Sequence, residues 1–574
     1  MKRKWLLFAI GWLIVLAGSL LAYITETANG VRIQDVRFTG SDGVAMSALL
    51  YIPPNATKAT PAPGILAVHG YINSRETQSG FAIEFARRGY VVLALDQTGH
   101  GYSGPPVFAN GFGGPDGLKY LRGLDFVDPA NIGLEGHSMG GWTVLQAAAK
   151  YPDGYKAIVL EGSSTGSGVA PEGSPQFPHN LALVYSQYDE FSVMMWEVDR
   201  ASTVTQSHKL WKVFGTDKPV VAGQVYGSIA DGTARVLYTP AITHPWDHIS
   251  KEAIGDSLEW FGRTLQGGTP LPADDQIWPR KEFGTLVALV GCVVVMLGAF
   301  EAMLKQPYFA RIARAPVVVR AARSPLWWLG VVCSAAIPVL TFYLFIGWGS
   351  AWAPSRLFPQ AITNQVLVWA LLNGVIAVGL GFLLRAPRVA FPIDIAPSLL
   401  IALASVATAY AALLIADFLF KVDFRWWVVA LKLMNAAQFR MFLVYLIPFA
   451  VYFVLLLRSM LSALPVQGES VGAQYLTSVT ALAAGFAVFL LVEYVTLFAS
   501  GLLFTTWLSG GHVSTPTAPL WTIVAIQFLP LMALVAVIAT FTYRRTGSYL
   551  PGAFICALFV TWYIVAGQAV QVPI

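Results

Sequence analysis

The second half of this 574-residue chain consists of long apolar segments with few charges between them. A helix of about 20 apolar residues crosses the hydrocarbon core of a bilayer, whereas the runs that build soluble cores are shorter. The whole sequence is 55% hydrophobic and only 12% charged, whereas roughly a quarter of the residues in soluble domains are charged. We therefore expect an all-α multi-pass transmembrane domain.

Residues 283–574 predict about eight transmembrane helices. They are expected near 283–304, 326–348, 363–384, 397–420, 441–457, 476–506, 519–541 and 550–571. A further apolar stretch, 5–23, follows the basic run Lys2-Arg3-Lys4 and predicts an uncleaved signal anchor within residues 1–29. A cleaved signal peptide is the alternative, although residues 25–30 contain no clear A-x-A cleavage site.

Charges are divided unevenly along the chain. Residues 26–282 hold 19 Lys and Arg against 26 Asp and Glu, whereas the remainder holds 18 against 6. Basic residues recur in alternate loops between the expected spans: Lys305, Arg311, Arg314, Arg320 and Arg323, then Arg385 and Arg388, then Arg458, then Arg544 and Arg545. The positive-inside rule assigns these loops to the cytoplasm and residues 30–270 to the extracytoplasmic side of the cytoplasmic membrane. We expect a lipid bilayer as partner and no nucleic acid.

Two features of the apolar half fit this topology less simply. Residues 421–440 carry four basic side chains in an expected outside loop, and with Trp426 and Trp427 they predict an amphipathic helix in the membrane interface. Glu493 falls inside an expected span, where an ionisable group indicates either a function or burial against another helix.

Residues 30–270 have the pattern of an α/β domain. Short apolar runs rich in β-branched residues, such as 64–68, 91–95, 157–160 and 181–184, alternate with longer mixed segments. This alternation predicts a mainly parallel sheet flanked by helices. Residues 271–282, which contain Pro272 and Pro279, are expected to form a linker to the membrane domain.

The segment Gly136-His137-Ser138-Met139-Gly140 follows the apolar run 131–135. A G-x-S-x-G sequence at a sharp strand-to-helix turn exposes a nucleophilic serine, and the glycines avoid collisions there. The three cysteines, Cys292, Cys333 and Cys556, lie outside the α/β region, so we expect neither a cysteine-based metal site nor any cofactor.

Candidates for the other catalytic groups follow Ser138 in the chain. Asp189 lies in the segment 186–191, immediately after the apolar run 181–185, with Glu190 as the fallback; a carboxylate there can orient an imidazole. His244 and His248 are the candidate bases. We favour His244, because it precedes the helix that Ser250 is expected to cap, whereas His248 lies almost on the cap.

The segment His69-Gly70-Tyr71 follows the run 64–68. A loop at the end of a strand can turn backbone N–H groups toward a developing oxyanion, and we expect Tyr71 and Met139 to supply them. His69 is expected to order this loop rather than to transfer protons.

Together these segments resemble the α/β-hydrolase family over residues 30–268, under half of the chain. The supporting motifs are His69-Gly70, residues 96–104, which are similar to the family's D-x-x-G-x-G-x-S turn, residues 136–141, and a late Asp and His. The resemblance implies an α/β-hydrolase fold, a serine nucleophile, and a structural role for His100.

The leading hypothesis is a membrane-bound serine hydrolase that cleaves carboxylic esters through an acyl-enzyme, with peptides or thioesters less favoured. Its substrate would be a small molecule or an acyl group derived from lipid or the cell envelope. The alternative is a membrane transporter or sensor whose hydrolase-like outer domain serves as a binding module, because a fold does not dictate activity.

Overall fold

The computed structural model describes residues 5–316, 320, 322–384, 394–509 and 517–573. Lys2, Arg3, Lys4, Arg385 and Arg388, which entered the topology expectation, lie outside the described residues.

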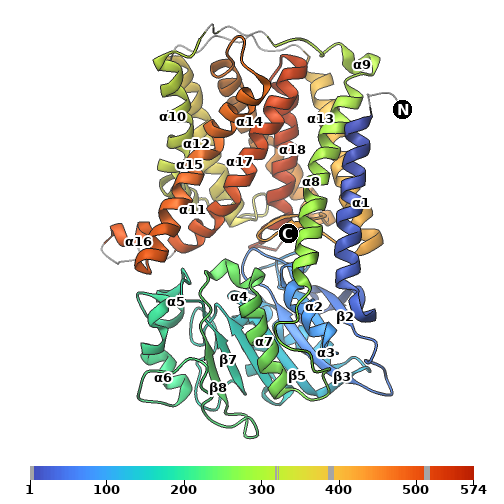
Figure 1. The fold of residues 1–574 in the computed structure, drawn as a ribbon, viewed down its shortest axis with the longest axis vertical. Helices are drawn as coiled ribbons and strands as arrows, with labels where there is room; N and C mark the ends of the chain where they lie inside the picture. Colours follow the sequence, from blue (N-terminus) through green and yellow to red (C-terminus); the bar gives the residue numbers. More distant parts are fainter. Residues whose placement is uncertain (1–4, 317–319, 321, 385–393, 510–516, 574) are drawn as a thin grey trace.

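An eight-stranded sheet organises the α/β domain, which occupies the lower part of Figure 1. The strands are β1 (Arg32–Thr39), β2 (Ala45–Ile52), β3 (Ala62–Val68), β4 (Val91–Asp96), β5 (Val127–His137), β6 (Ala157–Glu161), β7 (Leu181–Val184) and β8 (Arg235–Tyr238). Their spatial order is β1-β2-β4-β3-β5-β6-β7-β8. Only β2 pairs antiparallel with its neighbours β1 and β4 among these described strands; the pairs from β4 to β8 are parallel.

Helices cover both faces of this sheet, as parallel strands require. The helices of the domain are α2 (Ser79–Arg87), α3 (Gly114–Arg122), α4 (Met139–Lys150), α5 (Ser192–Trp196), α6 (His208–Phe214) and α7 (Lys251–Thr264). α3, α4 and α6 share one apolar core with the sheet, and α2 and α7 share the core on the opposite face. β3, β4, β6 and β7 are buried at every position.

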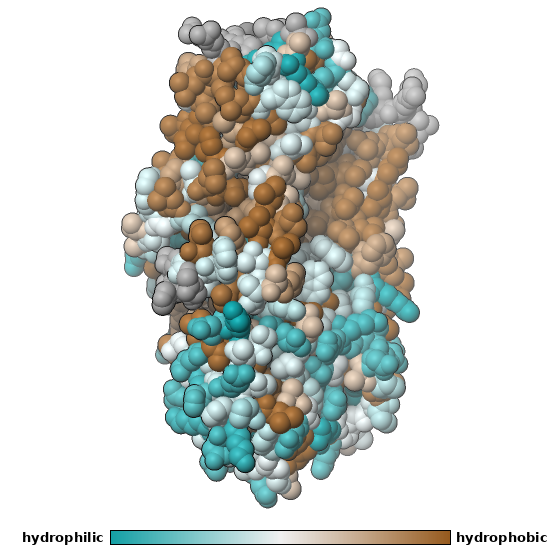
Figure 2. All heavy atoms as spheres, turned by 60° about the vertical axis from the view of Figure 1, so that its left-hand side comes forward, coloured by the Kyte–Doolittle hydropathy of each residue, from teal (hydrophilic) through white to brown (hydrophobic). Residues whose placement is uncertain are grey.

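The remaining helices form a separate layer of the molecule, which we call the helical region. It comprises α1 (Leu6–Glu26), α8 (Trp278–Met303), α9 (Pro307–Ala310), α10 (Pro325–Leu340), α11 (Phe342–Ser350), α12 (Ala361–Leu383), α13 (Ile395–Phe420), α14 (Ala436–Ala463), α15 (Val471–Ser500), α16 (Phe504–Leu508), α17 (Ala518–Thr546) and α18 (Leu550–Gly567). Figure 2 shows hydrophobic residues over the helical region and hydrophilic residues over the α/β domain.

Within the described residues, eight helices are long and apolar enough to cross a membrane, and the bent pair α10 and α11 would make a ninth span. The expected combination of an α/β-hydrolase-type sheet with a region of long apolar helices is confirmed.

Glycines bring α1 against α8, far from it in sequence (Figure 1). A Cβ on Gly11 or Gly18 would overlap the backbone of α8, and a Cβ on Gly284, Gly291 or Gly298 would overlap the backbone of α1. Small residues at such positions let two apolar helices approach closely and gain dispersion contacts.

The structure differs from the sequence expectation at one boundary and in one element. The expected linker 271–282 ends earlier, because α8 begins at Trp278, with Pro279 in its first turn, where a missing N–H costs nothing. The amphipathic helix expected within 421–440 is wrong: residues Phe424–Trp426 (β9) and Val429–Leu431 (β10) form an antiparallel hairpin. Arg425 points into the protein, where it pairs with Asp423 at 2.8 Å and donates to Thr77 at 3.0 Å.

Candidate active site at the junction with the helical region

Ser138 lies on a strained turn between β5 and α4. Its φ is 55° and its ψ is −122°, a conformation that a non-glycine residue adopts only where its surroundings hold it. The Ser138 N–H donates to the Glu161 carbonyl at 2.8 Å, and the Gly141 N–H donates to the Ser138 carbonyl at 2.9 Å. The turn is therefore fixed by backbone bonds, while the Ser138 side chain lines a cavity.

Glycine is required around this turn for steric reasons. A Cβ on Gly136 would overlap the Gly140 carbonyl, and a Cβ on Gly140 would overlap the Val68 carbonyl. A Cβ on Gly70 would lie 3.1 Å from both the His137 ring and the Ser138 Cβ. These three glycines, singled out in the sequence, let the β3 loop pack directly against the serine turn.

Asp189 and His244 meet at the carboxyl ends of β7 and β8. The Nδ1 atom of His244 lies 2.8 Å from Asp189 Oδ2, and Asp189 Oδ1 accepts from the Phe191 N–H at 2.7 Å. Both residues are buried. Because Asp189 engages Nδ1, the His244 Nε2 atom remains for a substrate or a hydroxyl, and His244 lines the same cavity as Ser138.

Surrounding carboxylates control the protonation of His244. Burial alone would lower the pKa of its imidazole, but Asp189, Asp247 and Glu190 outweigh burial and raise that pKa to about 9. Glu190 itself has a pKa raised to about 7, chiefly by burial and then by the nearby Asp189 carboxylate. Its Oε2 atom accepts from the His244 backbone N–H at 2.9 Å.

Sequence reasoning missed two residues that hold the His244 loop. The Nε2–H of His137 donates to the His244 carbonyl at 2.9 Å, and His137 Nε2 lies 3.5 Å from Asp247 Oδ2. Ser186 donates to the other Asp247 oxygen at 2.5 Å. His137 occupies a variable position of the G-x-S-x-G pattern, so the pattern gave no signal for it.

His248, the alternative base, also lines the cavity and is 4% exposed. Neither of its ring nitrogens has a hydrogen-bond partner among the described residues. Its ring packs 4.0 Å from that of His137, and burial holds its pKa well below the usual value. His248 therefore lacks the orienting carboxylate that His244 has.

The two expected oxyanion donors lie on the loop after β3 and at the start of α4. Met139 is the first residue of α4, so its N–H has no acceptor within the helix. Tyr71 lines the cavity beside Ser138. His69 is fully buried, with Nδ1 2.7 Å from the Gly70 carbonyl and Nε2 accepting from the Gln97 N–H at 3.2 Å, so it orders this loop.

His100 occupies a similar structural position. Its Nε2 atom accepts from the Ile72 N–H at 3.2 Å, and its Nδ1 atom lies 3.0 Å from the Thr98 carbonyl. Through His100, the D-x-x-G-x-G-x-S turn therefore holds the loop that follows β3.

The helical region forms the roof of the cavity. The cavity measures about 230 Å³, and besides the α/β residues it is lined by Val428 of the β9–β10 hairpin and by Leu520, Ile523 and Gln527 of α17. The neighbouring Trp427 donates to the Pro245 carbonyl at 2.5 Å. Figure 1 shows the α/β domain directly below the helical region, with the C-terminus between them.

The C-terminal tail packs against the loops beside this site. Val570 exchanges backbone hydrogen bonds with Gly99 and Val107, each at 2.9 Å. Gln571 Nε2 donates to the Tyr71 hydroxyl at 2.9 Å. Residues near the C-terminus therefore help to position the loop after β3, which carries Tyr71.

One group of side chains in this site has the composition of a metal centre. Ligand atoms of His137, His244 and Asp247 lie within 4.8 Å of one another. The hydrogen bonds assign these groups differently, because His137 Nε2 donates to a carbonyl and His244 Nδ1 faces Asp189. These bonds leave His137 Nδ1, which has no hydrogen-bond partner among the described residues, and His244 Nε2 as the nitrogens that could face a shared ion.

Comparisons with known proteins agree with the sheet topology. Residues 63–192 match the family model for the alpha/beta hydrolase fold. A monoacylglycerol lipase of Mycolicibacterium smegmatis is 31% identical over 146 residues, 23% of this chain and 49% of that protein. A quorum-quenching protein of Acinetobacter baumannii is 34% identical over 122 residues, 20% of this chain and 39% of that protein. The chain thus spans half or less of the length of these relatives.

Among solved structures, an esterase of Pyrococcus furiosus aligns at 17% identity with a TM-score of 0.31, over 41% of this chain and 92% of that chain. The family match and the eight-stranded sheet with its serine turn show that this chain contains an alpha/beta-hydrolase domain, joined to a region of long apolar helices.

Proposed function

We propose that the protein is a serine hydrolase that cleaves carboxylic esters at the extracytoplasmic face of a membrane. The observation that carries the proposal is the 2.8 Å contact between His244 Nδ1 and Asp189 Oδ2, in a cavity that also contains Ser138. The name of the monoacylglycerol lipase that this chain resembles favours an ester over an amide.

In the proposed reaction, His244 Nε2 removes the proton of the Ser138 hydroxyl as Oγ attacks the ester carbonyl carbon. The Tyr71 and Met139 N–H groups stabilise the resulting oxyanion. Collapse of the intermediate breaks the ester C–O bond, and the imidazolium gives its proton to the leaving alkoxide. Water, deprotonated by the same imidazole, then attacks the acyl-enzyme and releases the carboxylic acid and Ser138.

The arrangement of charge along the helices supports an extracytoplasmic hydrolase domain. Arg544 and Arg545 lie in the last turn of α17, at the end opposite to Leu520 and Gln527, which line the active-site cavity. Arg458 lies near the end of α14, whose first turn contacts Gly101 of the α/β domain through Gln438. The positive-inside rule then puts the end remote from the hydrolase domain in the cytoplasm.

Hydrolysis of p-nitrophenyl butyrate by purified protein tests the catalytic assignment. We expect turnover by the wild type and by Ser202→Ala, which alters an exposed serine of the same domain, and none by Ser138→Ala. His244→Ala should lose about 10³-fold or more in kcat, whereas His248→Ala should lose far less. Turnover by Ser138→Ala equal to the wild type contradicts the proposal, and a greater loss at His248 reverses the choice of base.

Membrane sidedness has its own test. A cysteine at Gly267, in a background lacking Cys292, Cys333 and Cys556, should react with a membrane-impermeant thiol reagent in intact cells. Labelling only after the membrane is permeabilised would place the domain in the cytoplasm and contradict this part of the proposal.

A further inference from the structure

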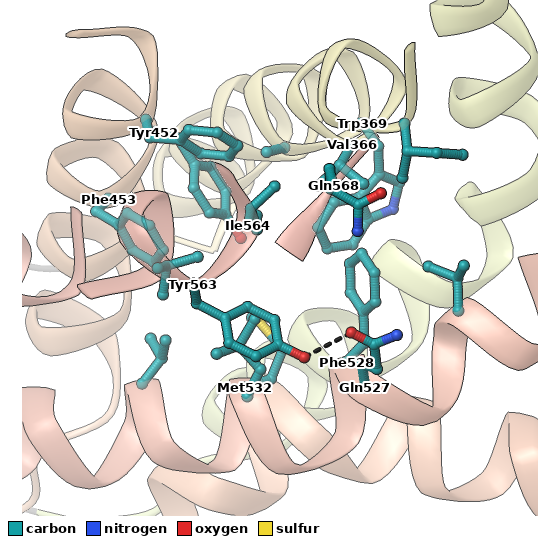
Figure 3. A pocket seen from close by; sticks show the side chains of 17 residues that line it. Val366, Trp369, Tyr452, Phe453, Gln527, Phe528, Met532, Tyr563, Ile564 and Gln568 are labelled. Carbon is teal, nitrogen blue, oxygen red and sulfur yellow. Dashed lines mark hydrogen bonds between the residues drawn. The ribbon is translucent and has the colours of Figure 1, made fainter. Parts of the chain in front are cut away.

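A second cavity lies inside the helical region, next to the active site. It measures about 50 Å³ and is enclosed by α12, α14, α17 and α18. Figure 3 shows Val366, Phe453, Phe528, Met532 and Ile564 around it. None of its lining residues is charged, and the walls are mainly aliphatic and aromatic. Such a cavity favours an apolar occupant over water or an ion.

Gln527 joins this cavity to the active site, because its side chain lines both. The Tyr563 hydroxyl donates to Gln527 Oε1 at 2.5 Å, and Figure 3 shows this bond at the wall of the inner cavity. The bond satisfies the amide oxygen within apolar surroundings and holds the side chain between the two spaces. Gln527 therefore lies at the boundary between the cavity of Ser138 and the second cavity.

The apolar path continues beyond the second cavity. A third cavity of about 70 Å³ shares Tyr452 and Met532 with the second, and Ile337, Leu380 and Leu456 add to its wall. Leu520 lines the active site, whereas Val535 lines the second cavity. Fifteen residues of α17, with Pro530 among them, separate these two, a distance of about 22 Å along the helix at 1.5 Å per residue.

We propose that this row of cavities receives the acyl chain of the ester that Ser138 hydrolyses, so that the substrate is an amphiphile with a long acyl chain. The inference rests on the proposed function. The carbonyl carbon must reach Ser138 Oγ, and the cavity there is lined by Val428 of the β9–β10 hairpin and by Leu520, Ile523 and Gln527 of α17. A chain attached to that carbon passes Gln527 and buries its methylene groups among the residues of α12, α14, α17 and α18.

A long acyl chain gives the long apolar helices a reason to line the cavity of a hydrolase site. Each methylene group that leaves water for an apolar cavity stabilises the complex, and the helices supply apolar lining next to Ser138. At about 50 Å³ the second cavity is much smaller than the apolar cavity of about 150 Å³ that binds one benzene molecule. A longer chain therefore has to extend toward the third cavity.

The first test compares esters that differ in where the chain is attached. p-Nitrophenyl acetate, butyrate, octanoate and decanoate lengthen the acyl side, and octyl and decyl acetate lengthen the alcohol side. Ala370→Leu fills the second cavity from α12, and Ala407→Leu is the matched control on the exposed side of α13. Val560→Leu fills the same cavity from α18, in case Ala370→Leu fails to fold.

We expect kcat/KM of the wild type to rise from acetate to decanoate. In Ala370→Leu the ratio of kcat/KM for decanoate to that for acetate should fall about tenfold, which corresponds to about 1.4 kcal/mol, or the burial of about two methylene groups. An unchanged ratio in both cavity-filling variants overturns the inference. A fall confined to the alkyl acetates also overturns it, because the cavity would then hold the alcohol chain.

A second test uses the wild-type protein. A decyl fluorophosphonate with a diazirine at the end of its chain labels Ser138 and, on illumination, crosslinks whatever surrounds the chain end. We expect crosslinked peptides from α12, α17 or α18. Crosslinks confined to the α/β domain contradict the acyl path, whereas a wild type that is not labelled at all contradicts the proposed function itself.

Discussion

Tyr494 of α15 donates a hydrogen bond to Glu190 Oε1 at 2.9 Å. The other oxygen of Glu190 accepts from the backbone N–H of His244, and the neighbouring Asp189 contacts the His244 ring. A long apolar helix is therefore linked through one carboxyl group to the candidate acid and base. The helical region therefore contacts the loop that holds His244, in addition to roofing the cavity.

Replacing Tyr494 by Phe should lower kcat/KM for p-nitrophenyl butyrate several-fold. The variant loses one hydrogen bond, worth about 0.5–1.5 kcal/mol, from the carboxyl group that holds the His244 backbone. Tyr475→Phe, near the other end of α15, is the control and should match the wild type. Equal activity of all three proteins would show that the Tyr494 bond does not position the base.

The pH dependence of hydrolysis should follow the protonation of His244. The imidazole accepts a proton only when neutral, and its pKa of about 9 makes it largely protonated at pH 7. Activity should therefore rise as the pH increases, with a midpoint near 9 in a plot of kcat/KM between pH 6 and 10.

Glu190→Gln tests the direction in which the His244 pKa is shifted. It removes one of the carboxylates that raise the His244 pKa, so the midpoint should move to lower pH. A wild-type midpoint at or below the ordinary histidine value of about 6.5, or a shift to higher pH in the variant, would contradict the assignment.

The sequence predicted the parts of the site that have local signatures. Ser138 is marked by its glycines, Asp189 by the apolar run that becomes β7, and His244 by its place ahead of the helix that Ser250 caps. Their spatial meeting follows from the parallel sheet, because the carboxyl ends of neighbouring strands lie at one edge.

The roof of the site had no such signature. Gln527 and Leu520 lie in an apolar helix whose pattern does not distinguish facing lipid from facing a cavity, and Gln571 follows the last helix. The hairpin at 424–431 was missed because Arg425, Trp426 and Trp427 also fit an interfacial helix. In the structure Arg425 pairs with Asp423 and donates to Thr77, which holds this segment as a hairpin. Thr77 and Arg425 lie almost 350 positions apart in the chain.

The bond between Gln571 and Tyr71 should contribute to catalysis through the oxyanion loop. Tyr71→Phe and Gln571→Ala each remove it while leaving the Tyr71 backbone N–H in place. We expect each to reduce kcat by a few-fold with little change in thermal stability. The double variant should be no worse than the more impaired single variant, because both remove the same bond. Fully additive losses would show that the two residues act independently.

Lys281 should be essential for joining the two parts of the protein. Its ammonium donates to Ser79 Oγ at 2.8 Å and lies 3.3 Å from Glu282, 3.9 Å from Glu26 and 3.9 Å from Asp423. Lys281→Met leaves Glu26 and Glu282 without this cation, whereas Asp423 keeps Arg425; loss of such a buried partner costs about 3–5 kcal/mol. Thermal unfolding in detergent should show a markedly lower Tm.

Lys305→Met is the control for this variant. Lys305 pairs with Glu301 at 3.2 Å near the other end of α8, and its side chain is 35% exposed. Such a pair contributes at most about 1 kcal/mol, so its loss should hardly change Tm. Equal Tm values for the two variants would show that the Lys281 cluster does not hold the junction.

Labelling with a fluorophosphonate probe tests the central claim most directly, because the probe reacts with an activated serine independently of the natural substrate. The claim is that Ser138, His244 and Asp189 form a working hydrolytic site beneath the helical region. The account predicts a single adduct, mapped by mass spectrometry to Ser138, that is absent in Ser138→Ala and strongly reduced in His244→Ala. A folded wild-type protein that does not react, or a Ser138→Ala variant that reacts equally, would contradict the account.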